Sequence, residues 1–180
     1  MIYMVDHVFA DPALEPEWHA WYAGYLQKLI AVPGIRSAQR FKALGCQPSR
    51  FLAMYTVDSA DVYTSAAYRN MGGGGSQSAR FHGAYRLWAR NLFAAASSDR
   101  GADPGVAAPR VMAGQRVLAF DRDAFEPQSP LAARATWLTA VGLHMTTKYR
   151  AVVVLDADAI ESAASVAGSY LYEPFTAFMS

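Results

Sequence analysis

The sequence predicts an α+β protein built from two tandem ferredoxin-like β-α-β-β-α-β units. One observation is the stretch 17–41, where an amphipathic helix ends at a Pro-Gly pair and leads into a strand. A second is the order of strand and helix patterns over residues 1–96. The third is a recurrence, because VDSADV at 57–62 matches LDADAI at 155–160. Chance similarity of short αβ pieces is the alternative, but the matches follow the order of the elements.

Composition and charge limit the classes of function. With 180 residues, 53% of them apolar, the chain fits one ordinary domain or two very small ones and can bury a core. Its formal charge is +1 and no basic run is interleaved with aromatic residues, so no nucleic-acid partner is expected. No apolar run reaches about 18 residues and no leader pattern is present, so we expect a cytoplasmic protein with no membrane partner. Cys46 is the only cysteine, which argues against a disulfide framework or a cysteine-based metal site.

The first strand is predicted over residues 2–9, where side chains alternate between two faces. His7 falls on an aromatic face and Asp6 on the opposite one, so Asp6 cannot orient His7 directly. A helix over 17–32 follows. Its apolar and mostly aromatic stripe consists of Trp18, Trp21, Tyr22, Tyr25 and Leu29. That stripe must lie on a sheet, and it is the expected wall of any cavity.

The rest of the first unit continues the alternation of strands and helices. A strand is expected over 35–44, its hairpin partner over 51–57 and a helix over about 60–70. The Gly-rich stretch 71–78 lacks the Lys-Ser or Lys-Thr of a phosphate-binding loop. Its four consecutive glycines indicate a mobile connection, either a lid over the cavity or simply a poorly fixed loop. A short helical piece and a fourth strand are predicted within 79–96.

Residues 97–114 have the composition of a linker, and the pattern begins again after them. The elements predicted there are a strand over 115–123, a helix over 131–143, a strand over 149–160, a helix over 158–167 and a strand over 169–178. The strand expected between 143 and 149 is short or lost. Arg122 occupies the place of His7 in this half, so chemistry is expected in the first unit alone.

Three segments of the chain resemble the dimeric α+β barrel superfamily, namely VPGIRSAQRF at 32–41, YTVDSADV at 55–62 and YRLWARNLF at 85–93. Members of this superfamily bury the open sheet face of each unit in a barrel made from two units. The resemblance therefore implies an intramolecular α+β barrel, and a homodimer of whole chains is compatible with it. The implied domains are a first unit at 1–96 with the active site, a linker at 97–114 and a second, degenerate unit at 115–180.

The pattern is nearest to cofactor-free polyketide cyclases and EthD-like members of that superfamily. The resemblance implies a pocket between sheet and helices with two histidines, at positions matched here by His7 and, across the Gly-rich insertion, His82. It also implies helix phenols, supplied here by Tyr22 and Tyr68. The residues expected to bind the substrate are Trp18, Trp21, Tyr25, Arg40, Tyr55 and Trp88. Tyr25 is an alternative to Tyr22 as the first phenol.

Plain alternatives exist for the charged and titratable residues among these. His7 is then an ordinary histidine of a half-buried strand and His82 a surface loop residue. Arg40 alternates along its strand with Arg36, so one or both meet an anionic group of the substrate, or they protect an edge strand from aggregation.

These residue types fit acid-base chemistry, because an imidazole takes a proton near neutral pH and a second imidazole or a phenol returns it. The leading hypothesis is an enzyme with no cofactor and no metal, a lyase, isomerase or cyclase. Its substrate is a hydrophobic small molecule, aromatic or polyketide-like. The alternatives are a cofactor-independent monooxygenase of the antibiotic-biosynthesis type, a haem protein with His7 or His82 as axial ligand, and a non-catalytic ligand-binding or assembly domain.

Overall fold

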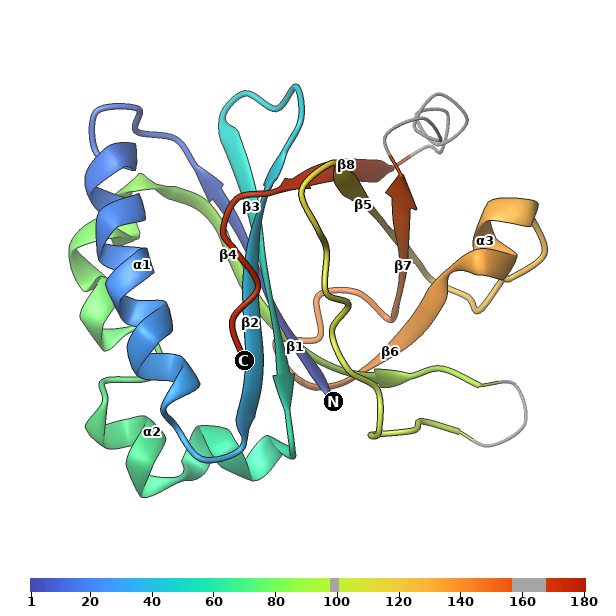
Figure 1. The fold of residues 1–180 in the computed structure, drawn as a ribbon, viewed down its shortest axis with the longest axis horizontal. Helices are drawn as coiled ribbons and strands as arrows, with labels where there is room; N and C mark the ends of the chain where they lie inside the picture. Colours follow the sequence, from blue (N-terminus) through green and yellow to red (C-terminus); the bar gives the residue numbers. More distant parts are fainter. Residues whose placement is uncertain (98–100, 157–167) are drawn as a thin grey trace.

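Eight antiparallel strands close into a barrel, and most of the helical segments pack against one side of it (Figure 1). The computed structural model describes residues 1–97, 101–156 and 168–180. The strands are β1 Ile2–Phe9, β2 Ile35–Ala43, β3 Ser49–Val57, β4 Tyr85–Ala95, β5 Gln115–Arg122, β6 Thr136–Leu143, β7 Tyr149–Asp156 and β8 Ser169–Pro174. They follow one another around the barrel in the order β1-β3-β2-β8-β5-β7-β6-β4.

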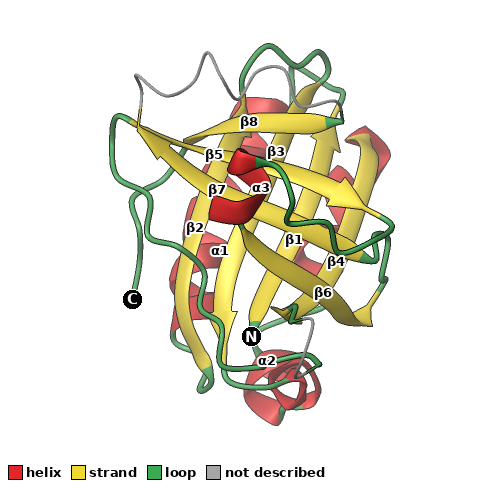
Figure 2. Ribbon diagram, turned by 90° about the vertical axis from the view of Figure 1, so that its right-hand side faces the viewer, coloured by secondary structure: helices red, strands yellow, loops and turns green. Residues whose placement is uncertain are grey.

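The described helical segments are α1 Glu15–Ile30, the 3₁₀ segment η1 Ala60–Thr64, α2 Ala66–Asn70, the 3₁₀ segment η2 Ser76–Ala84 and α3 Pro130–Arg134. The long helix α1 and the short α3 lie on opposite sides of the barrel (Figure 2). Within the described ranges, no helix is long and apolar enough to cross a membrane.

The predicted fold class is wrong, because the chain does not form two tandem ferredoxin-like units. The predicted helix at 131–143 is one short turn, α3, followed by the strand β6. β6 pairs with β4 on one side and with β7 on the other, so it satisfies backbone groups that a helix would leave open at two sheet edges. Its Thr136-Trp137-Leu138 start is β-branched and aromatic, which favours a strand. The predicted helix at 158–167 lies outside the described residues.

β1 separates two packed layers. Ile2 and Met4 point into the barrel and belong to a core that includes Phe41, Leu52 and Phe93. The outward face of β1 belongs to a second core, beneath α1. That face presents Tyr3, Val5, His7 and Phe9, as the alternation predicts. Aromatic rings are therefore prominent in the space between the barrel and the helices, beside aliphatic side chains such as Val5 and Leu29.

The helix α1 forms where its sequence predicts. Glu15, Pro16 and Glu17 occupy its first turn, where acidic groups complement the helix dipole and proline costs no hydrogen bond. After its last turn, Gly34 adopts φ +92°, and a Cβ there would come within 2.6 Å of Val62 Cγ2. The buried positions of the helix are Trp18, Tyr22, Leu26 and Leu29. Trp21 and Tyr25, also expected in the stripe, are half-buried at its side.

A chain of charges runs from the barrel interior to the exposed Asp121. Asp6 of β1 accepts a hydrogen bond of 2.8 Å from Arg150 of β7, and Arg150 holds Asp121 of β5 in a bidentate pair at 2.7 and 2.9 Å. Asp6 is 2% exposed and Arg150 is 5% exposed. The pair therefore joins the two halves of the barrel from inside, on the face of β1 opposite His7.

Candidate active site

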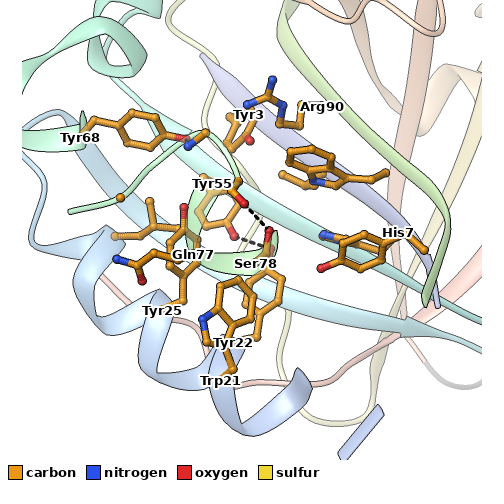
Figure 3. Close-up of a pocket in the computed structure, with 17 residues that line it drawn as sticks. Tyr3, His7, Trp21, Tyr22, Tyr25, Tyr55, Tyr68, Gln77, Ser78 and Arg90 are labelled. Carbon is orange, nitrogen blue, oxygen red and sulfur yellow. Dashed lines mark hydrogen bonds between the residues drawn. The ribbon is translucent and has the colours of Figure 1, made fainter. Parts of the chain in front are cut away.

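A cavity lies between the outer face of β1, β3 and β4 and the helical layer (Figure 3). It is lined by Tyr3, Val5, His7, Trp21, Tyr22, Tyr25, Leu29, Tyr55, Tyr68, Gly72, Gly74, Gly75, Gln77, Ser78, Tyr85, Trp88 and Arg90. The centres of water molecules have about 40 Å³ of space in it, and one bound water needs about 10–15 Å³ on that measure. A substrate with several rings therefore requires some wall of the cavity to move aside.

His7 is buried at the centre of this aromatic layer. It is 3% exposed, and its ring lies 5.3, 5.6 and 5.4 Å from those of Trp18, Tyr22 and Tyr85. No hydrogen bond joins its ring nitrogens to any described residue. Burial, and after it the Arg40 charge, hold the pKa of His7 well below its usual value of 6.5. His7 is therefore a neutral imidazole at pH 7, and its nitrogens are available to a molecule in the cavity.

Two phenols of the cavity are hydrogen-bonded to each other. The hydroxyl oxygens of Tyr22 and Tyr55 are 3.0 Å apart, and the Tyr3 ring stacks on that of Tyr55 with centroids 5.3 Å apart. Burial raises the pKa of both hydroxyls, while the Arg40 charge lowers that of Tyr22. Both phenols are protonated at neutral pH, so each can donate a hydrogen bond.

Arg40 stands behind the cavity and is absent from its lining. It is 1% exposed, and its guanidinium carbon lies 3.8 Å from the centre of the Tyr22 ring and 4.6 Å from that of Trp18. Its terminal nitrogen lies 3.3 Å from His19 Nδ1. Among the described residues no carboxylate forms an ion pair with it. Its positive charge therefore acts on the cavity through the Tyr22 ring.

The Gly-rich stretch forms part of the cavity wall. Gly74 N–H donates a hydrogen bond of 3.0 Å to the Tyr68 hydroxyl. A Cβ on Gly73 would come within 2.3 Å of the Tyr68 ring, and one on Gly75 within 2.4 Å of Trp88. Two rings therefore pack directly on the backbone of this turn, which only glycine permits.

Seven of the ten predicted site residues line the cavity: His7, Trp21, Tyr22, Tyr25, Tyr55, Tyr68 and Trp88. The other three do not. Trp18 lies beneath it and donates a hydrogen bond of 2.8 Å to the Tyr85 hydroxyl, and Arg40 lies behind Tyr22. His82 is exposed, stacks on Trp88 at 5.3 Å and is 3.1 Å from Ser78 Oγ. The roles assigned to these ten residues stay predictions.

The predicted site residues do not include several side chains that line the cavity, among them Tyr3, Gln77, Tyr85 and Arg90. Strand alternation was a signal for two of them, because Tyr3 shares a face with His7 and Arg90 shares one with Trp88. Nothing local marked Gln77, whose amide reaches back across the Gly-rich turn to the Met71 carbonyl. In the described part of the chain, no three His, Cys, Asp or Glu side chains gather as a metal site requires.

No family model matches the chain, and neither does any curated protein. Solved structures do resemble it. An anthrone oxidase-like protein superposes with a TM-score of 0.62 at 12% identity, covering 99% of this chain and 92% of that one. A "putative monooxygenase" from Lactobacillus acidophilus NCFM gives 0.54 at 5% identity, covering 97% of this chain and 94% of that one. A second protein of that name, from Fusobacterium nucleatum subsp. nucleatum, superposes with a TM-score of 0.53 at 8% identity, covering 97% of this chain and 92% of that one.

At these identities the likenesses show a shared fold. They are consistent with the superfamily that the sequence resembles. Neither the tandem repeat nor a particular member of the superfamily follows from them.

Proposed function

We propose that the protein is an enzyme that oxidises an electron-rich aromatic molecule with molecular oxygen and uses no dissociable cofactor. The observation that carries this proposal is the cavity beside His7. It combines aromatic walls with a buried neutral imidazole whose nitrogens have no hydrogen-bond partner among the described residues. Such a site holds a flat substrate, excludes water and offers one base.

The names of the structural neighbours support this choice of reaction. One neighbour is called anthrone oxidase-like and two are called monooxygenases. An anthrone carries a methylene group between two aromatic rings, opposite a carbonyl in the central ring, and the aromatic rings conjugate the carbanion with that carbonyl. Its carbon-bound protons are acidic enough for an imidazole to remove, and the resulting anion is electron-rich.

In the proposed reaction, His7 takes one proton from the methylene carbon. The carbanion gives an electron to oxygen, and the two radicals combine into a carbon-bound peroxide anion, which the imidazolium of His7 protonates. Loss of the second carbon-bound proton and cleavage of the O–O bond then release water and leave a ketone. The balance is R₂CH₂ + O₂ → R₂CO + H₂O, so no external reductant is needed.

Tyr22 and Tyr55 have a defined part in this scheme. One hydroxyl of the pair donates to the other, and the second donates a hydrogen bond to the oxygen on which negative charge develops, the enolate oxygen of the substrate or the peroxide. Arg40 favours that charge from behind the Tyr22 ring, 3.8 Å away. Because the site is buried, these interactions are weakly screened.

A lyase, isomerase or cyclase is the second candidate, because a base at His7 and a donor at Tyr22 are sufficient for proton transfer without oxygen. This reading predicts turnover under nitrogen to a product of the same oxidation state. A non-catalytic ligand-binding domain is the third, and it predicts binding without turnover.

Oxygen uptake with anthrone as the probe separates these candidates. We expect one O₂ consumed per quinone formed, at a rate above that of buffer alone. The variant His7→Gln should lower kcat/KM by about 10²–10⁴-fold, the range typical of a lost general base. Arg86→Gln is the matched control, since Arg86 is exposed and absent from the lining. Turnover without oxygen, or no effect of His7→Gln, would overturn the proposal.

The second predicted catalytic histidine is tested in the same assay. His82→Ala should lower kcat/KM as strongly as His7→Gln if His82 returns the proton. A change of less than about threefold leaves the return of the proton to His7, as in the scheme above and in keeping with the exposure of His82.

A further inference from the structure

Arg90 brings a positive charge to the wall of the cavity. The register of β1 and β4 sets Arg90 beside Val5 and sets Trp88 beside His7. Arg90 is therefore one pleat from His7, roughly 7 Å along the strand. Figure 3 shows Arg90 and Tyr3 together at one end of the cavity, away from His7.

Two hydrogen-bond donors at this end are buried and unused. Arg90 Nε and the Tyr63 hydroxyl have no hydrogen-bond partner among the described residues. The Tyr63 ring lies 4.7 Å from that of Tyr3, which lines the cavity. The Arg90 charge also acts to lower the pKa of Tyr3 and Tyr63 against the stronger effect of burial. Buried donors normally have partners, and unmade hydrogen bonds in a cavity mark a place for one.

The charge of Arg90 has no counter-charge in the cavity. No Asp or Glu occurs among the lining residues, and no described carboxylate forms an ion pair with Arg90. His7 and the lining phenols whose pKa burial shifts are neutral at pH 7. The described neighbours of the guanidinium are uncharged, namely the Trp88 ring at 5.0 Å and His144 Nε2 at 3.3 Å from the terminal nitrogen.

We propose that Arg90 is a specificity-determining residue that binds an anionic oxygen of the substrate, a carboxylate or a phenolate. The inference rests on the proposed function, because it takes the same cavity as the substrate site. Arg90 Nε donates a hydrogen bond to the anionic oxygen. The substrate class is then an aromatic acid or an ionised phenol rather than a neutral hydrocarbon. Arg40, which sequence reasoning assigned to this task, is enclosed by rings behind Tyr22 and does not reach the lining.

The test compares ligands that differ in charge and match in shape. Isothermal titration calorimetry under nitrogen measures 2-naphthoate against 2-naphthamide, and 4-nitrophenolate against 4-nitroanisole at about pH 8. We expect the wild type to bind the anion more tightly in at least one pair, and that pair identifies the type of oxygen. Arg90→Gln should weaken the preferred anion by about tenfold or more, as for a lost charged hydrogen bond, and leave its neutral partner nearly unchanged.

Two further variants keep the result specific. Arg90→Lys retains the charge and should keep part of the preference, and Arg86→Gln, on the same strand but exposed, should bind all four ligands as the wild type does. The inference is overturned if the wild type binds the anion and its neutral partner equally in both pairs, or binds no ligand at all. It is also overturned if Arg90→Gln loses as much affinity for the neutral ligand as for the anion. Because the assay involves no turnover, a clear preference without oxygen uptake refutes the proposed reaction and leaves the anion site standing.

Discussion

The hydroxyl oxygens of Tyr22 and Tyr55 lie 3.0 Å apart across the cavity, one from α1 and the other from β3. The pair joins the helical layer to the barrel at the point where the substrate must bind. One hydroxyl donates to the other, which leaves the second free to donate to a ligand.

We predict that Tyr22→Phe and Tyr55→Phe each lower kcat/KM for anthrone oxidation by about 10- to 10³-fold, the upper limit being the loss of one oxyanion donor. The double variant should have a kcat/KM within about twofold of that of the more impaired single variant, because the two hydroxyls act as one unit. Single-variant effects that multiply fully in the double variant would contradict this coupling. Thermal unfolding of each variant controls for loss of structure.

A second prediction concerns pH and stability. The depressed pKa of His7 means that the unfolded chain binds a proton below about pH 6.5 and the folded one does not. Stability is therefore fully present above about pH 6.5 and falls as the pH decreases, by up to about 1.4 kcal/mol per pH unit for one proton. His19, whose pKa is lowered to about 4, contributes in the same direction.

Urea unfolding at about pH 5 to 8 measures this slope. His7→Gln should have a shallower slope than the wild type, because it removes one of the histidines whose pKa is lowered in the folded protein. An unchanged slope in His7→Gln would show that folding does not lower the pKa of His7.

A third prediction compares two glycines of the cavity wall. Gly74 and Gly75 both have positive φ, at +81° and +100°, so alanine costs about 1–2 kcal/mol of stability at either position. A Cβ on Gly74 meets nothing within 4 Å, whereas one on Gly75 would come within 2.4 Å of Trp88. Gly75→Ala should therefore also displace Trp88 and weaken 2-naphthoate binding, and Gly74→Ala should not. Equal binding by both variants would show that the turn yields freely.

A fourth prediction concerns the ion pair inside the barrel. Asp6→Asn removes the buried carboxylate that pairs with Arg150, so it should lower the free energy of unfolding by about 3–5 kcal/mol. The double variant Asp6→Leu with Arg150→Met removes both charges and should be less destabilised than the single one. Guanidinium unfolding measures both, and a cost below about 1 kcal/mol for Asp6→Asn would show that Asp121 alone satisfies Arg150.

The sequence by itself determined the local elements of the first 57 residues and the two faces of β1. Its periodicity, two residues in a strand and 3.6 in a helix, records which side chains are buried together, so it separated His7 from Asp6 and assigned the aromatic stripe of α1 to the sheet. For the same reason it indicated that side chains of that stripe would line any cavity, as Trp21, Tyr22 and Tyr25 do. These features depend on residues that are close in the chain.

Only the tertiary structure decided the secondary structure of 131–143 and which residues line the cavity at its Arg90 end. A helix and a strand were both open to that segment, and the unpaired edges of β4 and β7 selected the strand β6. Gly75 packs against Trp88. Arg90 reaches the cavity because β4 lies beside β1, where it is paired with Val5, 85 positions earlier in the chain. Local periodicity carries no record of such partners, since it reports that a face is buried and not what buries it.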